Sequence, residues 1–187
     1  EAFPYVDSIG LTGLGETFMF KKLPEIVDYI RSKNNGIIIS VSTNAHLPIS
    51  VKMAEDLADK IDTIQVSIDG IGKVYEKVRL KSDYSFFYEN MLQTIEACRG
   101  KRATVMFNFV AIKENYHDMA DVVELAGKLG VKYVNITPFN VASVTIHDKT
   151  YYDFFQTAEF KTELKRAKAM AKNYPELLES ASSPAKV

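Results

Sequence analysis

The sequence has a single cysteine, Cys98, no block of like charges and no long apolar stretch. One cysteine excludes an internal disulfide bond and a cysteine-rich metal site within these residues. Because 23 Lys and Arg oppose 24 Asp and Glu, the net charge is -1, which argues against a nucleic-acid partner. No stretch approaches the roughly 18 apolar residues that a membrane-spanning helix needs, and no secretory signal is present. We therefore expect a cytoplasmic protein with no membrane partner.

The sequence does contain a regular succession of strands and helices. Of its 187 residues, 47% are hydrophobic, which is enough for one globular domain with a sizeable core. The expected strands cover residues 5–13, 36–44, 62–70, 103–112 and 131–139. The expected helices cover 23–33, a segment after Pro48, 85–98, 118–129 and 151–173. This alternation predicts βαβ units and a mainly parallel sheet, in a domain over residues 1–175 with a tail over 176–187.

Polar residues alternate with apolar ones along these strands. In the strand over 62–70, isoleucine and valine alternate with Gln65, Ser67 and Asp69. The polar positions of the other strands are Ser40, Ser42, Asn44, Asn108, Asn135 and Thr137. A parallel sheet covered on both faces reads as nearly continuous Val, Ile and Leu, so a repeated polar face indicates a curved, incomplete barrel that holds a polar ligand. The alternative is that these residues lie near strand ends and meet solvent.

The segment LTGLGET, from Leu11 to Thr17, ends the first strand and precedes the first helix. Gly13 and Gly15 permit a tight turn and a close approach of main-chain groups to a ligand, and Glu16 faces the same place. The carboxyl end of a parallel strand is where open α/β sheets and (β/α) barrels build their sites. Alternatively, Glu16 is an ordinary acid near the amino terminus of a helix.

Taken in order, the segments LTGLGET, STNA and VSIDG, then Arg79 and FNFVAIKENYHDM, resemble the core of radical S-adenosylmethionine enzymes. The resemblance runs from about Ser8 to Phe139 and is greatest to the branch of molybdenum-cofactor, peptide and quinone-cofactor maturases. It implies a partial (β/α)6 TIM-like barrel whose second to sixth strands this chain supplies. It also implies an oxidoreductase-type enzyme, in which a [4Fe-4S] cluster on a CxxxCxxC loop binds S-adenosylmethionine. Reductive cleavage then yields a 5'-deoxyadenosyl radical that abstracts hydrogen from a substrate.

The resemblance also assigns site residues by their positions in these motifs. The cofactor-binding candidates are Gly13, Gly15, Glu16, Ser67, Asp69 and Arg79. The first three meet the methionine amino group, which a carboxylate and carbonyls suit as acceptors. Ser67 and Asp69 lie at the ribose or the carboxylate, and Arg79 pairs with that carboxylate unless it is a solvated loop residue. The substrate-side candidates are Thr43, Asn44, Asn108, Lys113 and Thr137, with a surface position as the alternative for Lys113.

The chain departs from the family pattern at three points. Ala45 follows Thr43-Asn44 where the family has glycine, and Leu14 separates the two glycines of the GGE turn. The cluster-binding cysteines are absent, and we expect Cys98 to be a core thiol on a helix. We therefore expect the metal ligands and the first strand upstream of Glu1, and an inactive fragment. The exposed edge of the strand near residue 5 is then expected to favour a homodimer.

Two other functions remain as alternatives. One is a cluster-free (β/α)-barrel lyase or aldolase, which needs a phosphate loop or a strand lysine, whereas Lys132 lies at the wrong end of its strand. The other is a degenerate barrel that only binds S-adenosylmethionine. For the enzyme, the resemblance implies a small-molecule or peptide substrate and a reductant protein such as flavodoxin or ferredoxin. The three histidines, His46, His117 and His147, are too scattered for a zinc site or a catalytic triad.

Two segments are expected to have structural roles, with a substrate-facing position as the alternative for Tyr151 or Tyr152. The segment from Asn115 to Met119 is predicted to start a helix through an Asn or Asp cap. An aromatic cluster at the start of the last helix is predicted to pack against the sheet, and its members are Tyr151, Tyr152, Phe154, Phe155 and Phe160.

Overall fold

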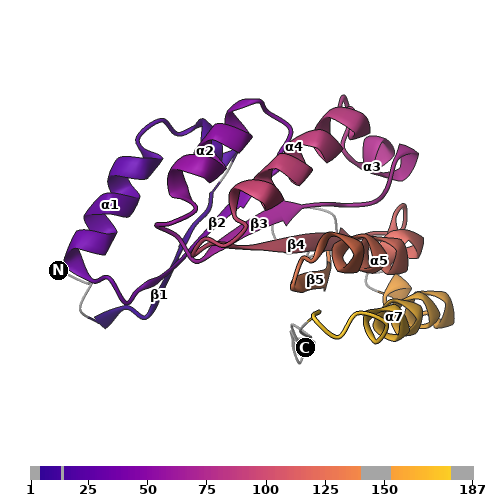
Figure 1. Ribbon diagram of the computed structural model, residues 1–187. Coiled ribbons are helices and arrows are strands. Elements are labelled where there is room, and N and C mark those ends of the chain that lie inside the picture. The colour runs from indigo at the N-terminus through magenta and orange to yellow at the C-terminus, as the bar shows by residue number, and fades with distance from the viewer. Residues whose placement is uncertain (1–4, 14, 140–152, 178–187) are drawn as a thin grey trace. The chain divides into compact units, whose positions relative to one another are not determined.

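The computed structural model describes residues 5–13, 15–139 and 153–177 (Figure 1). Its strands form one five-stranded sheet in the order of the sequence. They are β1 (Ser8–Leu11), β2 (Ile38–Thr43), β3 (Thr63–Ser67), β4 (Thr104–Ala111) and β5 (Tyr133–Pro138). The pairs β1–β2 and β2–β3 are parallel. In each pair, a helix connects the first strand to the second along the chain. The predicted α/β class with a parallel sheet is therefore confirmed.

The helices follow the predicted alternation. They are α1 (Leu23–Lys33), α2 (Ile49–Leu57), α3 (Lys73–Val78), α4 (Tyr84–Ala97), α5 (Met119–Leu129) and α7 (Ala158–Ala171), with 3-10 turns η2 (Thr17–Met19) and η3 (Tyr116–Asp118). No helix of the described residues has the length and the apolar character needed to cross a membrane. The chain divides into two compact units, each built from two segments. Unit 1 comprises Glu1–Ser67 and Ser85–Met106, and unit 2 comprises Ile68–Tyr84 and Phe107–Val187.

In unit 1 the strands separate an apolar face from a polar one, as the alternation predicts. Along β2 and β3 every second side chain is buried, and α1, α2 and α4 lie on one side of these strands (Figure 1). On the other face the parallel register places Ser42 beside Gln65, and the Ser42 hydroxyl donates to the Gln65 amide oxygen at 3.3 Å. This half-buried face has hydrogen-bonding groups and no formal charge at Ser40, Ser42 and Gln65.

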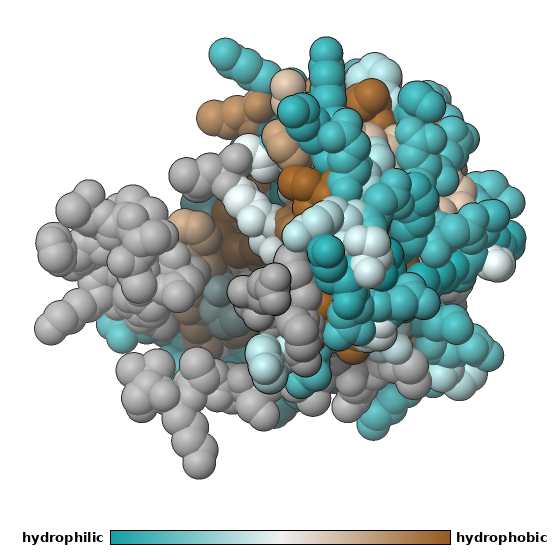
Figure 2. Space-filling model, turned by 90° about the vertical axis from the view of Figure 1, so that its left-hand side faces the viewer, coloured by the Kyte–Doolittle hydropathy of each residue, from teal (hydrophilic) through white to brown (hydrophobic). Residues whose placement is uncertain are grey.

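One end of the strand order is β1, whose outer edge has no strand beside it among the described residues. Large apolar side chains of unit 1 also remain exposed, among them Met19, Phe20 and Ile38. Figure 2 views the side on which β1 and α1 lie in Figure 1, and it shows apolar residues at the surface between hydrophilic ones. The open edge agrees with the sequence, while the homodimer through it stays a prediction.

In unit 2, α5 presents small and branched apolar side chains to a buried surface and packs against α7. The ring of Tyr174 lies directly over Gly127, where an added Cβ would come within 2.2 Å of the ring. Only glycine therefore lets the ring approach this helix so closely. As predicted, α5 ends at Gly130, which is left-handed with a φ of 71°.

The predicted continuous helix from residue 151 is wrong. The described chain turns at 155–157, and α7 begins only after Thr157, whose hydroxyl accepts from the Phe160 amide at 3.3 Å. Phe154 packs edge-on against Tyr116 of η3, with 5.0 Å between ring centroids, and Phe155 and Phe160 join the same cluster. Tyr151, Tyr152 and His147 lie outside the described residues.

Candidate functional site

In unit 1, Glu16 joins the turn after β1 to the end of β2. One carboxylate oxygen, Oε1, accepts from the Phe18 amide at 3.1 Å and so caps η2. The other, Oε2, accepts from the Asn44 amide at 2.7 Å. The preceding residue, Gly15, has a φ of 97°, a conformation that favours glycine. Glu16 is thus an acid at the start of a short helix, as one interpretation of the sequence predicts, and it also fixes two strand ends to each other.

The turn after β2 satisfies its own backbone amides. The buried Thr43 hydroxyl accepts from the Ala45 amide at 3.0 Å, and the Asn44 side-chain oxygen accepts from the His46 amide at 2.9 Å. Ala45 has a φ of 51°, so this position requires the left-handed conformation that the glycine of the family motif adopts readily. Because the amides from Asn44 to His46 are already bound by side chains, the turn has little capacity for an anion.

The turn around Glu16 contains hydrogen-bond acceptors that a ligand could use. Each carboxylate oxygen of Glu16 accepts one hydrogen bond from a backbone amide. A carboxylate has about four lone-pair positions, so further hydrogen bonds can be accepted. Glu16 is half-buried, and Gly13 and Gly15 beside it are exposed. An added Cβ at either glycine would meet nothing within 4 Å, so the backbone here is open to a neighbouring molecule. This arrangement suits a positively charged donor such as an ammonium group.

In unit 2, Asp69 and Arg79 form an ion pair. Asp69 is only 7% exposed, and its Oδ2 contacts Arg79 Nε at 2.9 Å and Nη2 at 2.7 Å. Its Oδ1 accepts from the Val110 amide of β4 at 3.0 Å. The Arg79 guanidinium lies 5.7 Å from the centroid of the Tyr75 ring, and burial raises the pKa of Tyr75 to about 12, which keeps this phenol neutral. Asp69 is therefore engaged with the protein and holds Arg79.

The loop after β3 is fixed to the end of β4 by two residues for which the sequence predicted a different role. Asn115 is fully buried, and its side chain bonds to the backbone of Asp69, Val110 and Ile112. Asp118 accepts from the Ile71 amide at 2.8 Å. Neither side chain caps the helix that follows it, so the predicted Asn or Asp cap is wrong.

Burial raises the pKa of the Asp118 carboxyl above its ordinary value, against the lowering effect of the Ile71 amide. The carboxylate also lies beside Gly70, where an added Cβ would come within 3.1 Å of Oδ2. Asp118 thus both packs against this loop at Gly70 and accepts a hydrogen bond from it at Ile71.

The remaining candidates are placed as follows. Ser67 ends β3 and is half-buried, and so is Thr137 on β5. Asn108 on β4 accepts from the Asn135 side chain of β5 at 2.7 Å, a pair that neither residue's local sequence indicates. Lys113 is exposed, with Nζ 5.9 Å from the centroid of the Phe154 ring, which agrees with the surface alternative.

The structure thus brings the predicted residues together in small groups. Glu16 meets Asn44 in unit 1, and Asp69 meets Arg79 in unit 2. No local pattern in the sequence indicates the bond of Asn115 to Asp69 or that of Asp118 to Ile71, because these partners lie 46 and 47 residues away along the chain.

The residues present do not fit an iron–sulfur cluster, which requires cysteine thiolates. The one cysteine, Cys98, directly follows α4 and is buried, and burial raises the pKa of its thiol to about 11. The described residues also contain no group of three or more His, Cys, Asp or Glu placed to hold a metal ion. Cys98 is the core thiol that the sequence predicted.

The comparisons with known proteins agree on the fold. The sequence model of the Radical SAM superfamily matches residues 2–126, more than half of the chain. The solved structure of TYW1 with a lysine-pyruvate adduct bound is similar at a TM-score of 0.59 and 19% identity, over 89% of this chain and 50% of that one. Streptococcus suis SuiB bound to its precursor peptide SuiA is similar at a TM-score of 0.67 and 17% identity, over 88% and 36% of the two chains.

SuiB bound to S-adenosylmethionine is similar at a TM-score of 0.61 and 18% identity, over 92% of this chain and 42% of that chain. This chain therefore spans half or less of the length of these solved proteins. No curated protein sequence is significantly similar to it.

Proposed function

Because this chain belongs to the radical SAM superfamily, we propose that it forms the S-adenosylmethionine-binding part of a radical enzyme. The observation that supports this proposal is the acceptor-rich turn of unit 1, at the carboxyl ends of β1 and β2. Its amides are bound by its own side chains, and Glu16 keeps lone pairs beyond its two bonds. We assign Glu16 to the ammonium group of the methionine part, with Gly13 and Gly15 keeping the backbone open beside it.

In this superfamily, S-adenosylmethionine is cleaved reductively, and the resulting radical abstracts hydrogen from a substrate. The residues of this chain bind and orient the molecule. A [4Fe-4S] cluster is implied by the family, but the chain has only Cys98, so the cluster ligands are proposed to lie upstream of Glu1. No reaction step is assigned to residues of this chain.

The substrate is proposed to be a small molecule or a peptide. The peptide alternative is favoured by the likeness to SuiB, whose structure contains a bound precursor peptide. The uncharged, hydrogen-bonding face of β2 and β3 suits a polar neutral group such as a peptide amide. Electrons are proposed to come from a protein such as flavodoxin or ferredoxin.

The role of Glu16 is tested by ligand binding to the full-length gene product, reconstituted with iron and sulfide and left unreduced. We expect Glu16→Gln to weaken binding of S-adenosylhomocysteine about 10- to 100-fold, because a charge-assisted hydrogen bond to the ammonium is lost. Binding of 5'-methylthioadenosine, which lacks the amino acid part, is expected to change little. Isothermal titration calorimetry measures both.

A matched control is Glu25→Gln, which removes the same charge from an exposed position in the first turn of α1. It is expected to leave both affinities unchanged. Equal weakening of both ligands by Glu16→Gln would mean that Glu16 acts only in folding the turn. If the unsubstituted protein binds neither ligand, the assignment of the chain to S-adenosylmethionine binding is wrong.

A further inference from the structure

Asn108 and Asn135 form an amide pair within unit 2. Asn108 lies in β4 and Asn135 in the neighbouring strand β5, and both residues are half-buried. The Asn135 Nδ2 donates to the Asn108 Oδ1 at 2.7 Å. Phe107 and Phe109, whose side chains point to the opposite face of β4, are fully buried. The pair therefore lies on the more open face of this strand.

The pair uses only part of its hydrogen-bonding capacity. In the described part of the chain, Asn108 Nδ2 and Asn135 Oδ1 contact no hydrogen-bond partner. The Asn108 side chain thus keeps two N–H donors, and the Asn135 carbonyl oxygen keeps two lone pairs. Because both side chains are neutral amides, the pair presents a donor and an acceptor without a formal charge.

Asparagine is a poor residue for either strand if the pair serves only the fold. It is depleted in strands, whereas β-branched residues are enriched there. The other residues of β4 and β5 largely follow this preference, among them Val105, Val110, Val134 and Ile136. A pair of valines at the two positions would pack across the strands and leave no amide group without a partner. Departures from local preference are expected at functional positions.

The two available groups determine which ligand fits. A carboxylate has acceptors only and an ammonium group has donors only, so neither satisfies both asparagines. A primary carboxamide presents a carbonyl oxygen for Asn108 Nδ2 and an N–H for Asn135 Oδ1 on one edge. A trans peptide bond has its N–H and C=O on opposite edges, so it satisfies one asparagine at a time.

We infer that the Asn108–Asn135 pair binds a primary carboxamide group, the group that ends asparagine and glutamine side chains. The site belongs to unit 2 alone. That its ligand is the substrate rests on the proposed function, to which the inference adds Asn135 and the chemical class of one substrate group. In a peptide substrate, this group is the side chain of Asn or Gln.

The test compares propanamide with butanone, in which a methyl group replaces the NH2 group. Saturation-transfer difference NMR measures the binding of each to the reconstituted, unreduced full-length protein. We expect propanamide to bind about 3- to 10-fold more tightly, because butanone cannot donate a hydrogen bond. The double variant Asn108→Val with Asn135→Val is expected to lose this preference. Its melting temperature is expected to stay the same or rise, because valine suits a strand.

A second variant tests the pairing itself. In Asn135→Asp, the introduced carboxylate accepts from Asn108 Nδ2, and both side chains then present acceptors. We expect this variant to bind propanamidinium about 10-fold or more tightly than propanamide, because this cation has N–H donors on both nitrogens of one edge. A purely structural pair would not produce this exchange of preference, and its absence overturns the inference.

Asn173→Val is the matched control, because Asn173 is an exposed asparagine of the same unit. It is expected to leave the preference for propanamide unchanged. Equal binding of propanamide and butanone by the unsubstituted protein, or a preference that survives the double variant, overturns the inference. Weaker binding of S-adenosylhomocysteine by the double variant also overturns it, because the ligand is then adenine, whose edge has one donor and one acceptor. If the unsubstituted protein does not bind S-adenosylhomocysteine, the proposed function fails, while the carboxamide site is still decided by the propanamide comparison.

Discussion

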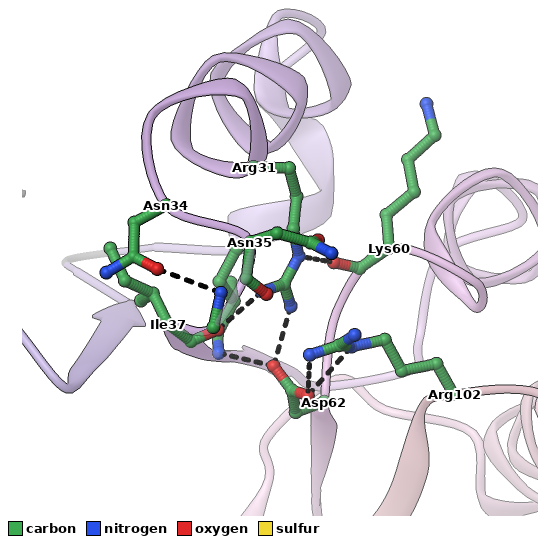
Figure 3. Close-up of polar contacts among 9 residues, drawn as sticks. Arg31, Asn34, Asn35, Ile37, Lys60, Asp62 and Arg102 are labelled. Carbon is green, nitrogen blue, oxygen red and sulfur yellow. Dashed lines mark hydrogen bonds and ion pairs between the residues drawn. The ribbon is translucent and has the colours of Figure 1, made fainter.

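Asp62→Ala is expected to lower the free energy of unfolding by about 2 kcal/mol, because the charge-assisted hydrogen bonds of a half-buried carboxylate are lost. The Asp62 carboxylate connects three parts of unit 1 (Figure 3). Its Oδ2 accepts from the Ile39 amide and from Arg31 Nη2, each at 2.7 Å. Its Oδ1 contacts Arg102 Nε and Nη2, each at 2.8 Å. The substitution leaves these donors without their shared acceptor, and urea unfolding monitored by circular dichroism measures the loss.

Arg31 makes the loss larger than the pair alone suggests. Its side chain is 11% exposed, and it also donates to the carbonyls of Lys60, Asn35 and Ile37. The guanidinium therefore cannot turn to solvent without giving up these bonds. The control is Asp59→Ala, which removes the exposed pair with Lys101 and is expected to cost less than about 1 kcal/mol. Equal effects of the two variants would show that Asp62 is no more than a surface charge.

The contribution of Asp62 is expected to depend on pH. Burial alone would raise the pKa of this carboxyl, but the bonds from Ile39, Arg31 and Arg102 outweigh burial and hold it below its ordinary value of 3.8. A lowered folded-state pKa means that the stabilisation is present above 3.8 and is lost as the pH falls through the folded-state value. The difference in unfolding free energy between the unsubstituted protein and Asp62→Ala should therefore shrink in acid below that pH. A constant difference would contradict the lowered pKa.

Gly70→Ala is the second substitution with a large expected effect, a loss of about 3 kcal/mol in unfolding free energy. Gly70 has a φ of 143°, which side chains rarely adopt, and an added Cβ would lie 2.8 Å from Val74 Cγ1, 3.0 Å from the Tyr75 amide nitrogen and 3.1 Å from Asp118 Oδ2. The backbone nitrogen cannot move aside without disturbing α3. Thermal unfolding followed by circular dichroism measures the loss.

Gly72 provides the matched control two residues away. It also has a positive φ, 55°, but an added Cβ there would meet nothing within 4 Å. Gly72→Ala therefore carries a conformational cost without a steric clash, about 1 to 2 kcal/mol. A similar loss for both variants would mean that the space around Gly70 relaxes, contrary to the close packing seen against Val74 and Asp118.

The sequence predicts those parts of the fold that depend on local signals. Pro24 and the Asn34–Gly36 stop place α1 within its observed bounds, and Gly130 marks the end of α5. Alternation of apolar and polar residues predicts which face of β2 and β3 is buried. This pattern can be recognised within one strand, without knowing which strands lie beside it.

The α7 boundary was missed although Thr157 is a good helix cap with Glu159 in the first turn. The predicted helix included the aromatic residues that precede this cap. Their actual partner, Tyr116, lies far from them along the chain. A tertiary contact therefore decides this segment, and local sequence does not contain it.

The candidate site was predictable mainly through motif order. The bond between Glu16 and the Asn44 amide spans 28 residues, and no local pattern indicates it. The order of LTGLGET and STNA at successive strand ends does place the two turns at one edge of the sheet. Asn115 stands in a motif too, but its role depends on the carbonyl positions of two strand ends, which only the folded chain defines.

The most direct test of the central claim is the release of 5'-deoxyadenosine by the full-length gene product. The protein is reconstituted anaerobically with iron and sulfide, then reduced in the presence of S-adenosylmethionine, and the product is measured by liquid chromatography. We expect release that requires the cluster-binding cysteines proposed to lie outside this sequence and that falls about 10-fold or more in Glu16→Gln, with Glu25→Gln unaffected. No 5'-deoxyadenosine from a protein that contains its complete sequence would contradict the assignment of this chain to radical chemistry.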